Sequence, residues 1–319
     1  MADAQVTHAI ISREYFGLRL DVVLARLFPE YSRSQLAVWL KEGAITLNHK
    51  PAKPKDKVLG GERIDLTIDS STHKALLSCE AEDIPLTIVY EDNTLLVLNK
   101  PAGLVVHPGA GNPLHTLVNG LLHHAPSLEQ LPRAGIIHRL DKDTTGLLLV
   151  AKTLTAHTNL TRQMQAREIH RNYLTLVQGH LISGGEINTC YGRHPKNRLK
   201  MAVRAEGRQA ITFYTIEKQY QDFTLLDVEL LTGRTHQIRV HMQSINHPVV
   251  GDPLYGGRMR FPPKANDTLR ECISHFQRQA LHAYKLSFTH PETEEVLTCE
   301  APLPDDFHTL LTALDGNLD

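Results

Sequence analysis

A short polar segment between two apolar runs is the feature that most constrains the fold of this chain. Residues 138–146 are His-Arg-Leu-Asp-Lys-Asp-Thr-Thr-Gly, preceded by Gly-Ile-Ile at 135–137 and followed by Leu-Leu-Leu-Val-Ala at 147–151. Such apolar runs predict buried strands on both sides of a turn. Loops held by buried strands commonly carry functional residues, so Asp141, which lies near Arg139, is a candidate reactive carboxylate. The alternative is an ordinary turn, because Asp, Lys and Gly are favoured there for conformational reasons alone.

The composition sets the size and class of the protein. A chain of 319 residues with 41% hydrophobic residues can bury one large core and a smaller satellite core. No apolar run is long enough to span a membrane, and the first residues lack the pattern of a secretion signal, so we expect a cytoplasmic protein without membrane contact. The four cysteines have no paired spacing, which argues against a zinc site and against a disulfide framework.

The charges are segregated along the chain although their sum is only -1. Residues 162–208 contain nine Lys or Arg and three acids, whereas residues 291–319 contain eight acids and no Lys or Arg. This distribution favours a basic face opposed by an acidic one, which suits a polyanionic partner. Solvated surfaces without a partner are the alternative interpretation.

The N-terminal residues predict a small domain of their own. Apolar residues recur at helical spacing over 20–27 and 36–40, which predicts two short helices, and Ser32 with Gln35 forms the pattern of a capping box for the second. Trp39 fits the core-facing side of that helix. Residues 44–48 and 63–68 then alternate as strands do.

A lysine-rich loop joins those two expected strands. Residues 49–57 hold two prolines and four lysines, namely Lys50, Lys53, Lys55 and Lys57. Core packing does not account for this charge, whereas contact with nucleic-acid phosphates does, because ammonium groups supply affinity there without reading bases.

The rest of the chain mixes short strands with helices and contains no internal repeat or Walker loop. Gly109-Ala110-Gly111 lacks the third glycine of a dinucleotide fingerprint, so no nucleotide cofactor is indicated. The chain has 19 histidines, but none pairs at helical metal-ligand spacing with an acid nearby, and His236 and His241 lie in a segment that we expect to be a strand. We therefore predict neither a metal nor a cofactor.

Several motifs recur together in the order typical of one enzyme family. They are the aspartate motif at 138–146, Asn-Lys-Pro-Ala-Gly-Leu at 99–104, Arg-Asn-Tyr at 171–173, Gly-Arg-Thr-His-Gln-Ile-Arg-Val-His at 233–241 and His-Pro-Val-Val-Gly-Asp-Pro-Leu-Tyr-Gly at 247–256. With these motifs the chain resembles the RNA pseudouridine synthases of large-subunit ribosomal RNA, in particular their D-type bacterial branch, and the N-terminal part resembles an S4 RNA-binding module. The family often has Thr-Ser-Gly where this chain has Thr144-Thr145-Gly146.

The resemblance implies an α+β fold in which a small S4 domain precedes a larger synthase domain with a mixed, largely antiparallel sheet flanked by helices. We expect a tail at 1–12, the S4 domain at 13–75, an acidic linker at 76–92 and the catalytic domain at 93–319. The implied substrate is large-subunit ribosomal RNA, either free or in a precursor subunit, with the hairpin loop of helix 69 as the target. We expect the protein to act as a monomer.

The resemblance also implies roles for individual residues. Asp141 is the catalytic residue, Arg234 is the cation that keeps it ionised, and Tyr173 stacks on the target base and assists a proton transfer. Ile238 packs behind the tyrosine, and Arg139 contacts RNA near the extruded nucleotide. In the S4 module the implied RNA contacts are Arg33, Ser34, Gln35 and the four loop lysines.

The chemistry of pseudouridine formation is compatible with this residue set. A glycosidic bond is broken and the base is rejoined through carbon without net redox change or hydrolysis, which calls for a carboxylate at the sugar, as a nucleophile or as an electrostatic partner. A buried Asp stays ionised only beside a cation. Two other classes remain open: an S4-type assembly factor without catalysis, and a glycosidic hydrolase, for which a suitably placed second carboxylate is not evident.

Overall fold

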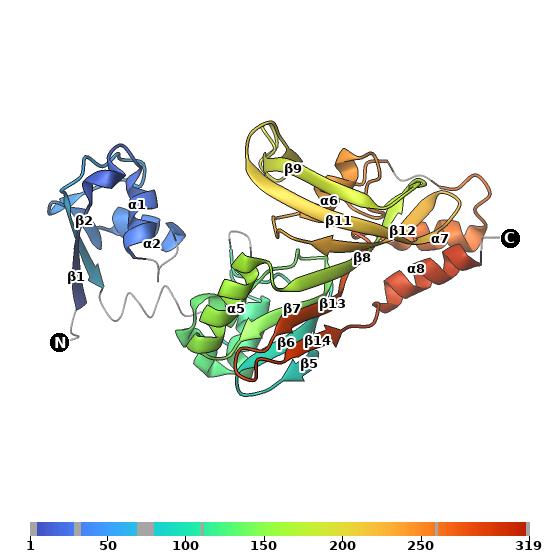
Figure 1. Ribbon diagram of the computed structural model, residues 1–319, viewed down its shortest axis with the longest axis horizontal. Coiled ribbons are helices and arrows are strands. Elements are labelled where there is room, and N and C mark those ends of the chain that lie inside the picture. Colours follow the sequence, from blue (N-terminus) through green and yellow to red (C-terminus); the bar gives the residue numbers. More distant parts are fainter. Residues whose placement is uncertain (1–4, 29–32, 69–79, 110–111, 259–260, 317–319) are drawn as a thin grey trace. The chain divides into compact units, whose positions relative to one another are not determined.

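The chain forms two compact units, residues 1–78 and residues 79–319 (Figure 1). The structure is a computed structural model that describes residues 5–28, 33–68, 80–109, 112–258 and 261–316.

The N-terminal unit is a four-stranded antiparallel sheet with two helices. Its elements are β1 (Gln5–Ile10), the 3-10 turn η1 (Arg13–Tyr15), α1 (Leu20–Leu27), α2 (Arg33–Glu42), β2 (Ile45–Leu47), β3 (Lys50–Pro51) and β4 (Arg63–Ile68). The strand order is β1-β4-β2-β3. Trp39 is 1% exposed and lies in a core with Leu20, Leu24 and Leu36, which confirms the predicted helix pair and the core position of the tryptophan.

The expected tail at 1–12 is wrong for the residues that the structure describes. β1 pairs with β4 along its whole length, from Gln5 opposite Ile68 to Ile10 opposite Arg63. Ile11 is buried, and its N–H donates to the carbonyl of Glu62. The pairing comes from a strand more than fifty residues away, so the local pattern carries little sign of it. The predicted capping box falls on Ser32, which lies outside the described residues.

The larger unit is built around one ten-stranded mixed sheet. Its elements are β5 (Ile88–Glu91), β6 (Leu95–Lys100), α4 (Leu117–His124), η2 (Pro126–Gln130), η3 (Pro132–Gly135), β7 (Thr145–Ala151), α5 (Leu154–Ala166), β8 (His170–Gln178), β9 (Gly185–Arg193), β10 (Met201–Val203), β11 (Arg208–Gln219), β12 (Phe223–Leu230), α6 (Gln237–Ser244), α7 (Asp267–His275), β13 (Leu281–Thr289), β14 (Val296–Glu300) and α8 (Asp305–Asp315). The order is β10-β9-β11-β12-β8-β13-β7-β6-β5, with β14 beside β13. Of the described strand pairs, β13 with β7 is parallel and the others are antiparallel.

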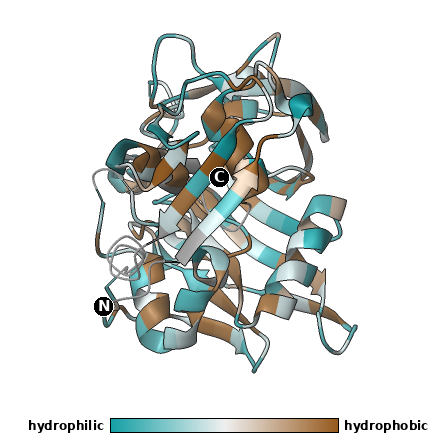
Figure 2. Ribbon diagram, turned by 90° about the vertical axis from the view of Figure 1, so that its left-hand side faces the viewer, coloured by the Kyte–Doolittle hydropathy of each residue, from teal (hydrophilic) through white to brown (hydrophobic). Residues whose placement is uncertain are grey.

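β7 is buried on both faces of this sheet, as the apolar run at 147–151 predicts. Leu148 and Val150 belong to one core, to which α4 contributes, while Leu147 and Leu149 belong to a second core with α5. Figure 2 shows that the helical ribbons carry both hydrophobic and hydrophilic residues, as expected for helices that bury one side. The strand that follows the polar turn is thus fixed from both sides.

The apolar flank before the polar turn does not form the expected strand. Arg133, Ala134 and Gly135 all have positive φ, of 56°, 52° and 76°, and turn the chain sharply. A Cβ on Gly135 would lie 2.0 Å from the carbonyl oxygen of Ala151, so glycine permits the close approach. In place of the expected strand, this flank forms an isolated bridge from Ile136 to Val150.

The segment at 233–241 is also not a strand, because α6 begins at Gln237. All residues from 237 to 242 are buried, so this helix lacks the polar face that would reveal a helical period. The alternation of Ile238 and Val240 with polar neighbours imitates a strand.

The expected linker at 76–92 ends earlier than predicted. The side-chain Nδ2 of Asn119 on α4 donates to the backbone carbonyl of Glu80, and the backbone carbonyl of Asn119 accepts the N–H of Glu82. β5 then joins the large sheet from Ile88. Residues from 80 onward therefore pack as part of the larger unit.

Candidate active site

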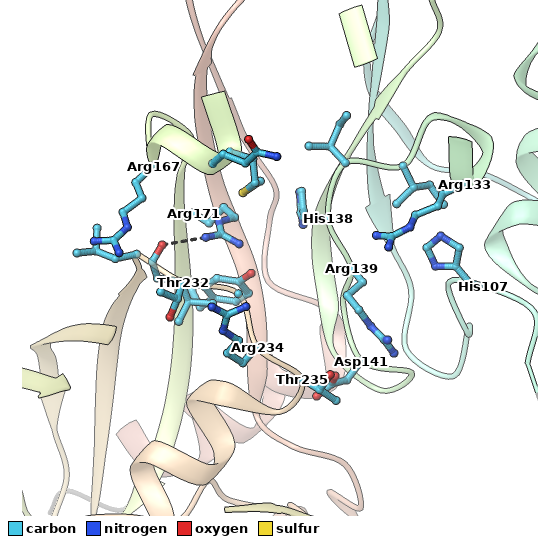
Figure 3. Close-up of a pocket in the computed structure, with 18 residues that line it drawn as sticks. His107, Arg133, His138, Arg139, Asp141, Arg167, Arg171, Thr232, Arg234 and Thr235 are labelled. Carbon is cyan, nitrogen blue, oxygen red and sulfur yellow. Dashed lines mark hydrogen bonds between the residues drawn. The ribbon is translucent and has the colours of Figure 1, made fainter. Parts of the chain in front are cut away.

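A cavity of about 690 Å³ opens beside the polar turn (Figure 3). Its walls come from the segment between η3 and β7, from the end of α5 with the start of β8, and from the loop between β12 and α6. Five arginines and one carboxylate, that of Asp141, line it; the arginines are Arg133, Arg139, Arg167, Arg171 and Arg234. This excess of positive charge suits a polyanionic ligand.

Arg239 on α6 holds Asp141 in place. Its Nη1 donates to Oδ2 of Asp141 at 2.9 Å, while Nε and Nη2 donate to the two oxygens of Asp252 at 2.7 and 2.9 Å. The Asp252 side chain is fully buried and that of Arg239 is 6% exposed, whereas that of Asp141 is 16% exposed. One guanidinium thus connects a buried anchor to a carboxylate that reaches the cavity.

The charges around Arg239 keep it protonated. Burial lowers its pKa, but the hydrogen bond and charge of Asp252, followed by those of Asp141, raise it above the ordinary value. The Nε2 of His236 lies 4.0 Å from Asp141, and its Nδ1 lies 2.8 Å from the hydroxyl of Tyr255. Burial lowers the pKa of His236 although Asp141 raises it. Arg239 is therefore the permanent positive charge next to Asp141.

The cation expected at this place, Arg234, makes different contacts. Its Nε donates to the carbonyl of Gln209 at 3.4 Å, and its backbone N–H donates to Oε1 of Gln237 at 3.0 Å. The prediction that Arg234 pairs with Asp141 is therefore wrong for this structure, since Arg239 occupies that position. Arg234 precedes α6 and lines the cavity instead.

A smaller space of about 40 Å³ brings together the residues that the resemblance assigned to catalysis. Its lining includes Asp141, Tyr173, Arg234, Ile238 and Arg139. Three separate parts of the chain supply them: the turn before β7, strand β8, and the loop and first turn of α6.

Tyr173 and Ile238 form the apolar side of this space. Tyr173 is 4% exposed and Ile238 is 3% exposed, and both belong to the main core. Burial raises the pKa of Tyr173; Arg171 opposes this shift and Asp141 adds to it. The phenol is therefore protonated at neutral pH and can donate a proton or present its ring face.

Buried cations fix the backbone of the turn that carries Asp141. Lys100 is 1% exposed, and its Nζ donates three hydrogen bonds. The acceptors are the carbonyl oxygens of Pro101, Leu104 and Lys142, at 2.7, 3.0 and 2.8 Å. Burial lowers the pKa of Lys100 to about 7, although Asp143 and Asp141 raise it. Arg278 donates to the carbonyl of Asp143 at 3.3 Å, so the turn is held on both sides.

The predicted RNA contacts of the small unit lie on its surface where the structure describes them. Lys50, Lys53, Lys55 and Lys57 are all exposed. Asp56 shapes their loop by accepting the N–H of Lys53 at 2.7 Å. Arg33, Ser34 and Gln35 lie in the first turn of α2, and their side chains fall outside the description.

Reasoning from the sequence missed four residues that build this site. They are Lys100, Arg171, Arg239 and Asp252. Each lies in one of the motifs on which the resemblance rests, so position in a shared motif was the available signal. Their roles depend on contacts between distant segments, which a motif does not contain.

The comparisons with known proteins define the class. Residues 94–244 match the family described as RNA pseudouridylate synthase, and residues 18–64 match the S4 domain. The structure of human RNA Pseudouridylate Synthase Domain Containing 4 superimposes with a TM-score of 0.56 at 25% identity, over 72% of this chain and 93% of that chain. The structure of human RNA Pseudouridylate Synthase Domain Containing 1 superimposes with a TM-score of 0.54 at 26% identity, over 71% of this chain and 87% of that chain. The protein is an RNA pseudouridine synthase with an S4 domain, and hence an isomerase.

Relatives along the whole chain narrow the class further. Ribosomal large subunit pseudouridine synthase D of Xanthomonas campestris is 49% identical over 98% of this chain and 93% of its own length. The protein of the same name from Haemophilus influenzae is 50% identical over 97% of this chain and 95% of its own length. The chain belongs to the family of ribosomal large subunit pseudouridine synthases D. The predicted family, the α+β fold and the enzyme class are confirmed. The alternative interpretation, an S4-type assembly factor without catalysis, does not agree with this family.

No described helix is both long and apolar enough to cross a membrane. Within the described residues, no group of three or more His, Cys, Asp or Glu side chains is placed to hold a metal ion.

Proposed function

We propose that this protein converts uridines in the helix 69 hairpin loop of large-subunit (23S) ribosomal RNA to pseudouridine, with Asp141 as the catalytic carboxylate. The observation that carries the proposal is the position of Asp141, which reaches an arginine-lined cavity while Arg239 holds it from behind. The names of the relatives support ribosomal RNA as the substrate. We further propose that a cytoplasmic monomer acts on free RNA or on a precursor subunit.

The balance of the reaction suits the residues that line the cavity. The bond from ribose C1′ to N1 of uracil breaks, a bond from C1′ to C5 forms, the proton on C5 leaves and N1 gains a proton. The carboxylate of Asp141 acts at the sugar, where an electron-deficient ribose needs a negative partner. Because atoms and electrons balance within the substrate, no cofactor is required.

The target uridine has to leave its stack to reach Asp141. Extrusion costs on the order of a few kcal/mol, and least for a base that is already unpaired, so a hairpin loop is a favourable substrate. We propose that Tyr173 stacks on the extruded base with Ile238 behind it, while Arg139 and Arg234 contact the RNA around it. This arrangement uses the space that these four side chains share with Asp141.

The small unit supplies affinity in this proposal. The exposed Lys50, Lys53, Lys55 and Lys57, together with Arg33, Ser34 and Gln35 in the first turn of α2, would bind backbone phosphates around the hairpin. Such contacts give register and affinity but no base recognition.

A map of pseudouridines in cellular RNA tests the proposal. Cells lacking the protein are complemented with wild type, Asp141→Asn or Asp143→Asn. Their large-subunit RNA is then treated with carbodiimide and reverse-transcribed. We expect the stops in the helix 69 loop to return with wild type and with the matched control Asp143→Asn, but not with Asp141→Asn. Stops that persist without the protein would overturn the target, and full rescue by Asp141→Asn would overturn the catalytic role.

A further inference from the structure

Arg171 is a buried cation without a charged partner. It is 7% exposed and lines the large cavity. Its Nη2 donates to the carbonyl of Leu230 at 3.1 Å (Figure 3), but its Nε is buried and has no hydrogen-bond partner. Among the described carboxylates, none forms an ion pair with it, in contrast to Arg239. A buried guanidinium in this state is costly until an anion arrives.

His138 presents a second unmet donor in the same cavity. The N–H of Leu149 donates to Nε2 of His138 at 3.3 Å, so that nitrogen carries no proton. Burial, together with the charge of Arg171, lowers the pKa of His138 to about 3, so the ring is neutral at pH 7. The proton of the neutral ring therefore lies on Nδ1, which is buried and has no acceptor.

The unmet groups are concentrated in this cavity. Five buried side-chain atoms lack a hydrogen-bond partner in the described part of the chain, and three of them, on Arg171, His138 and His107, belong to residues that line it. Buried polar atoms are otherwise nearly always paired. This concentration indicates a site formed for a ligand rather than scattered packing defects.

The loop before α6 leaves room for the guanidinium. A Cβ added to Gly233 would lie 2.7 Å from Nη1 of Arg171, so any larger residue would push the arginine aside. Gly233 itself has no positive φ that would require glycine. Space for Arg171 is thus a physical reason for glycine at this position.

We propose that Arg171 and His138 form a subsite for one backbone phosphate of the RNA, next to the extruded uridine. The inference rests on the proposed entry of the RNA into this cavity. Both unmet groups are donors, and a phosphate oxygen is an acceptor that also neutralises the fixed charge of Arg171. A uracil carbonyl would accept the same hydrogen bonds but would leave a buried cation without a counter-charge. Holding the phosphate fixes the attached ribose relative to Asp141.

Neutral substitutions of single phosphates test the subsite directly. The Asp141→Asn variant is mixed with hairpin RNAs that carry one uncharged methylphosphonate linkage each, at successive positions around the target uridine, and Kd is measured. We expect one linkage to weaken binding about tenfold or more. In the Asp141→Asn, Arg171→Gln double variant that linkage should have no further effect, and the slope of log Kd against log salt should fall by about one.

Two further variants separate the subsite from a loss of folding. Gly233→Ala keeps the charge of Arg171 but displaces its guanidinium, and it should weaken the response to the same linkage. Lys218→Gln removes a cation that already pairs with Asp315, and it should keep the full response. Melting temperatures of all variants identify any that are unfolded.

The contrary outcomes are distinct from failure of the proposed function. If each methylphosphonate linkage raises Kd by the same factor with and without the Arg171→Gln substitution, no phosphate binds to Arg171 and the subsite is excluded. A second contrary outcome is an effect of the base alone. If a thiocarbonyl on the target uracil weakens binding only when Arg171 is present, and no methylphosphonate linkage does so, Arg171 binds the base and the proposal is overturned. Failure of the helix 69 assignment would appear instead as wild-type enzyme that forms no pseudouridine in that hairpin.

Discussion

Nη1 of Arg239 lies 2.9 Å from Oδ2 of Asp141, and the rest of that guanidinium is committed to the fully buried Asp252. The orientation of the Asp141 carboxylate therefore depends on the ion pair between Arg239 and Asp252, which water does not reach. An arginine fork fixes both angle and distance, which a single ammonium group cannot do.

Exchanging each of the two candidate cations for lysine should separate their roles. We expect Arg239→Lys to lower kcat by about a hundredfold, because the charge remains while the fork that positions Asp141 is lost. Arg234→Lys should mainly raise KM, since Arg234 lines the cavity and its hydrogen bonds go to Gln209 and Gln237. Single-turnover kinetics on a hairpin RNA measure both effects. A larger loss of kcat in Arg234→Lys would mean that Arg234 becomes the partner of Asp141 once RNA is bound.

Gly146, the last residue of the aspartate motif, should not tolerate a side chain. Its φ is 111°, and a Cβ would lie 2.2 Å from the carbonyl oxygen of Ala283 on the parallel neighbour β13. We expect Gly146→Ala to lower the free energy of unfolding by about 3 kcal/mol or more, from backbone strain and steric overlap together. Urea denaturation measures this. Gly109→Ala is the control, because a Cβ there meets nothing within 4 Å and its φ is not positive; similar stabilities for both variants would contradict the prediction.

What the sequence predicted well are local features. Asp141 stands in a contiguous motif, and the apolar run at 147–151 becomes a strand buried on both faces. The helix at Leu20–Leu27 follows a periodic pattern that needs no distant partner to be recognised. Motifs in a shared order then added the family and the α+β fold.

What it predicted poorly depends on distant contacts. Asp141 and Arg239 are 98 positions apart, and the choice of Arg239 over Arg234 follows from the start of α6 at Gln237. Residues 237–242 of that helix are all buried, so the sequence gives little sign of its helical period. β1 likewise depends on backbone pairing with β4, a strand far away in the sequence.

Asp92 should make the stability of the larger unit depend on pH. Its Oδ1 accepts the N–H groups of Thr94 and Leu95, and its Oδ2 accepts hydrogen bonds from Tyr90 and His290. Burial raises the pKa of Asp92, but these hydrogen bonds outweigh it and lower the pKa below 3.8. A lowered folded pKa means that the stabilisation is complete above 3.8 and is lost as pH falls through the folded value.

The substitution Asp92→Asn measures how much this carboxylate contributes to the free energy of unfolding. Asp92→Asn should lower the free energy of unfolding by about 2 kcal/mol at pH 7, since the charge-assisted hydrogen bonds are lost. The difference between wild type and variant should shrink as pH is lowered from about 4 toward about 2, which denaturation at several pH values would show. A difference that stays constant over this range would mean that Asp92 stabilises through its shape rather than its charge.

The lysine loop should determine much of the salt dependence of RNA binding. Lys53 and Lys55 are exposed, and the loop is shaped by Asp56 rather than by these two side chains. Each phosphate contact releases about one counterion, so the Lys53→Gln, Lys55→Gln double variant should lower the slope of log Kd against log salt by about two and raise KM. The matched control is Lys218→Gln with Lys285→Gln, which removes the same charge from lysines already paired with Asp315 and Glu300. If both double variants change the slope equally, the effect comes from net charge, and the loop does not bind phosphates. If the loop variant alone changes it, the small unit contributes affinity through the backbone of the RNA, and recognition of the uridine is left to the cavity around Asp141.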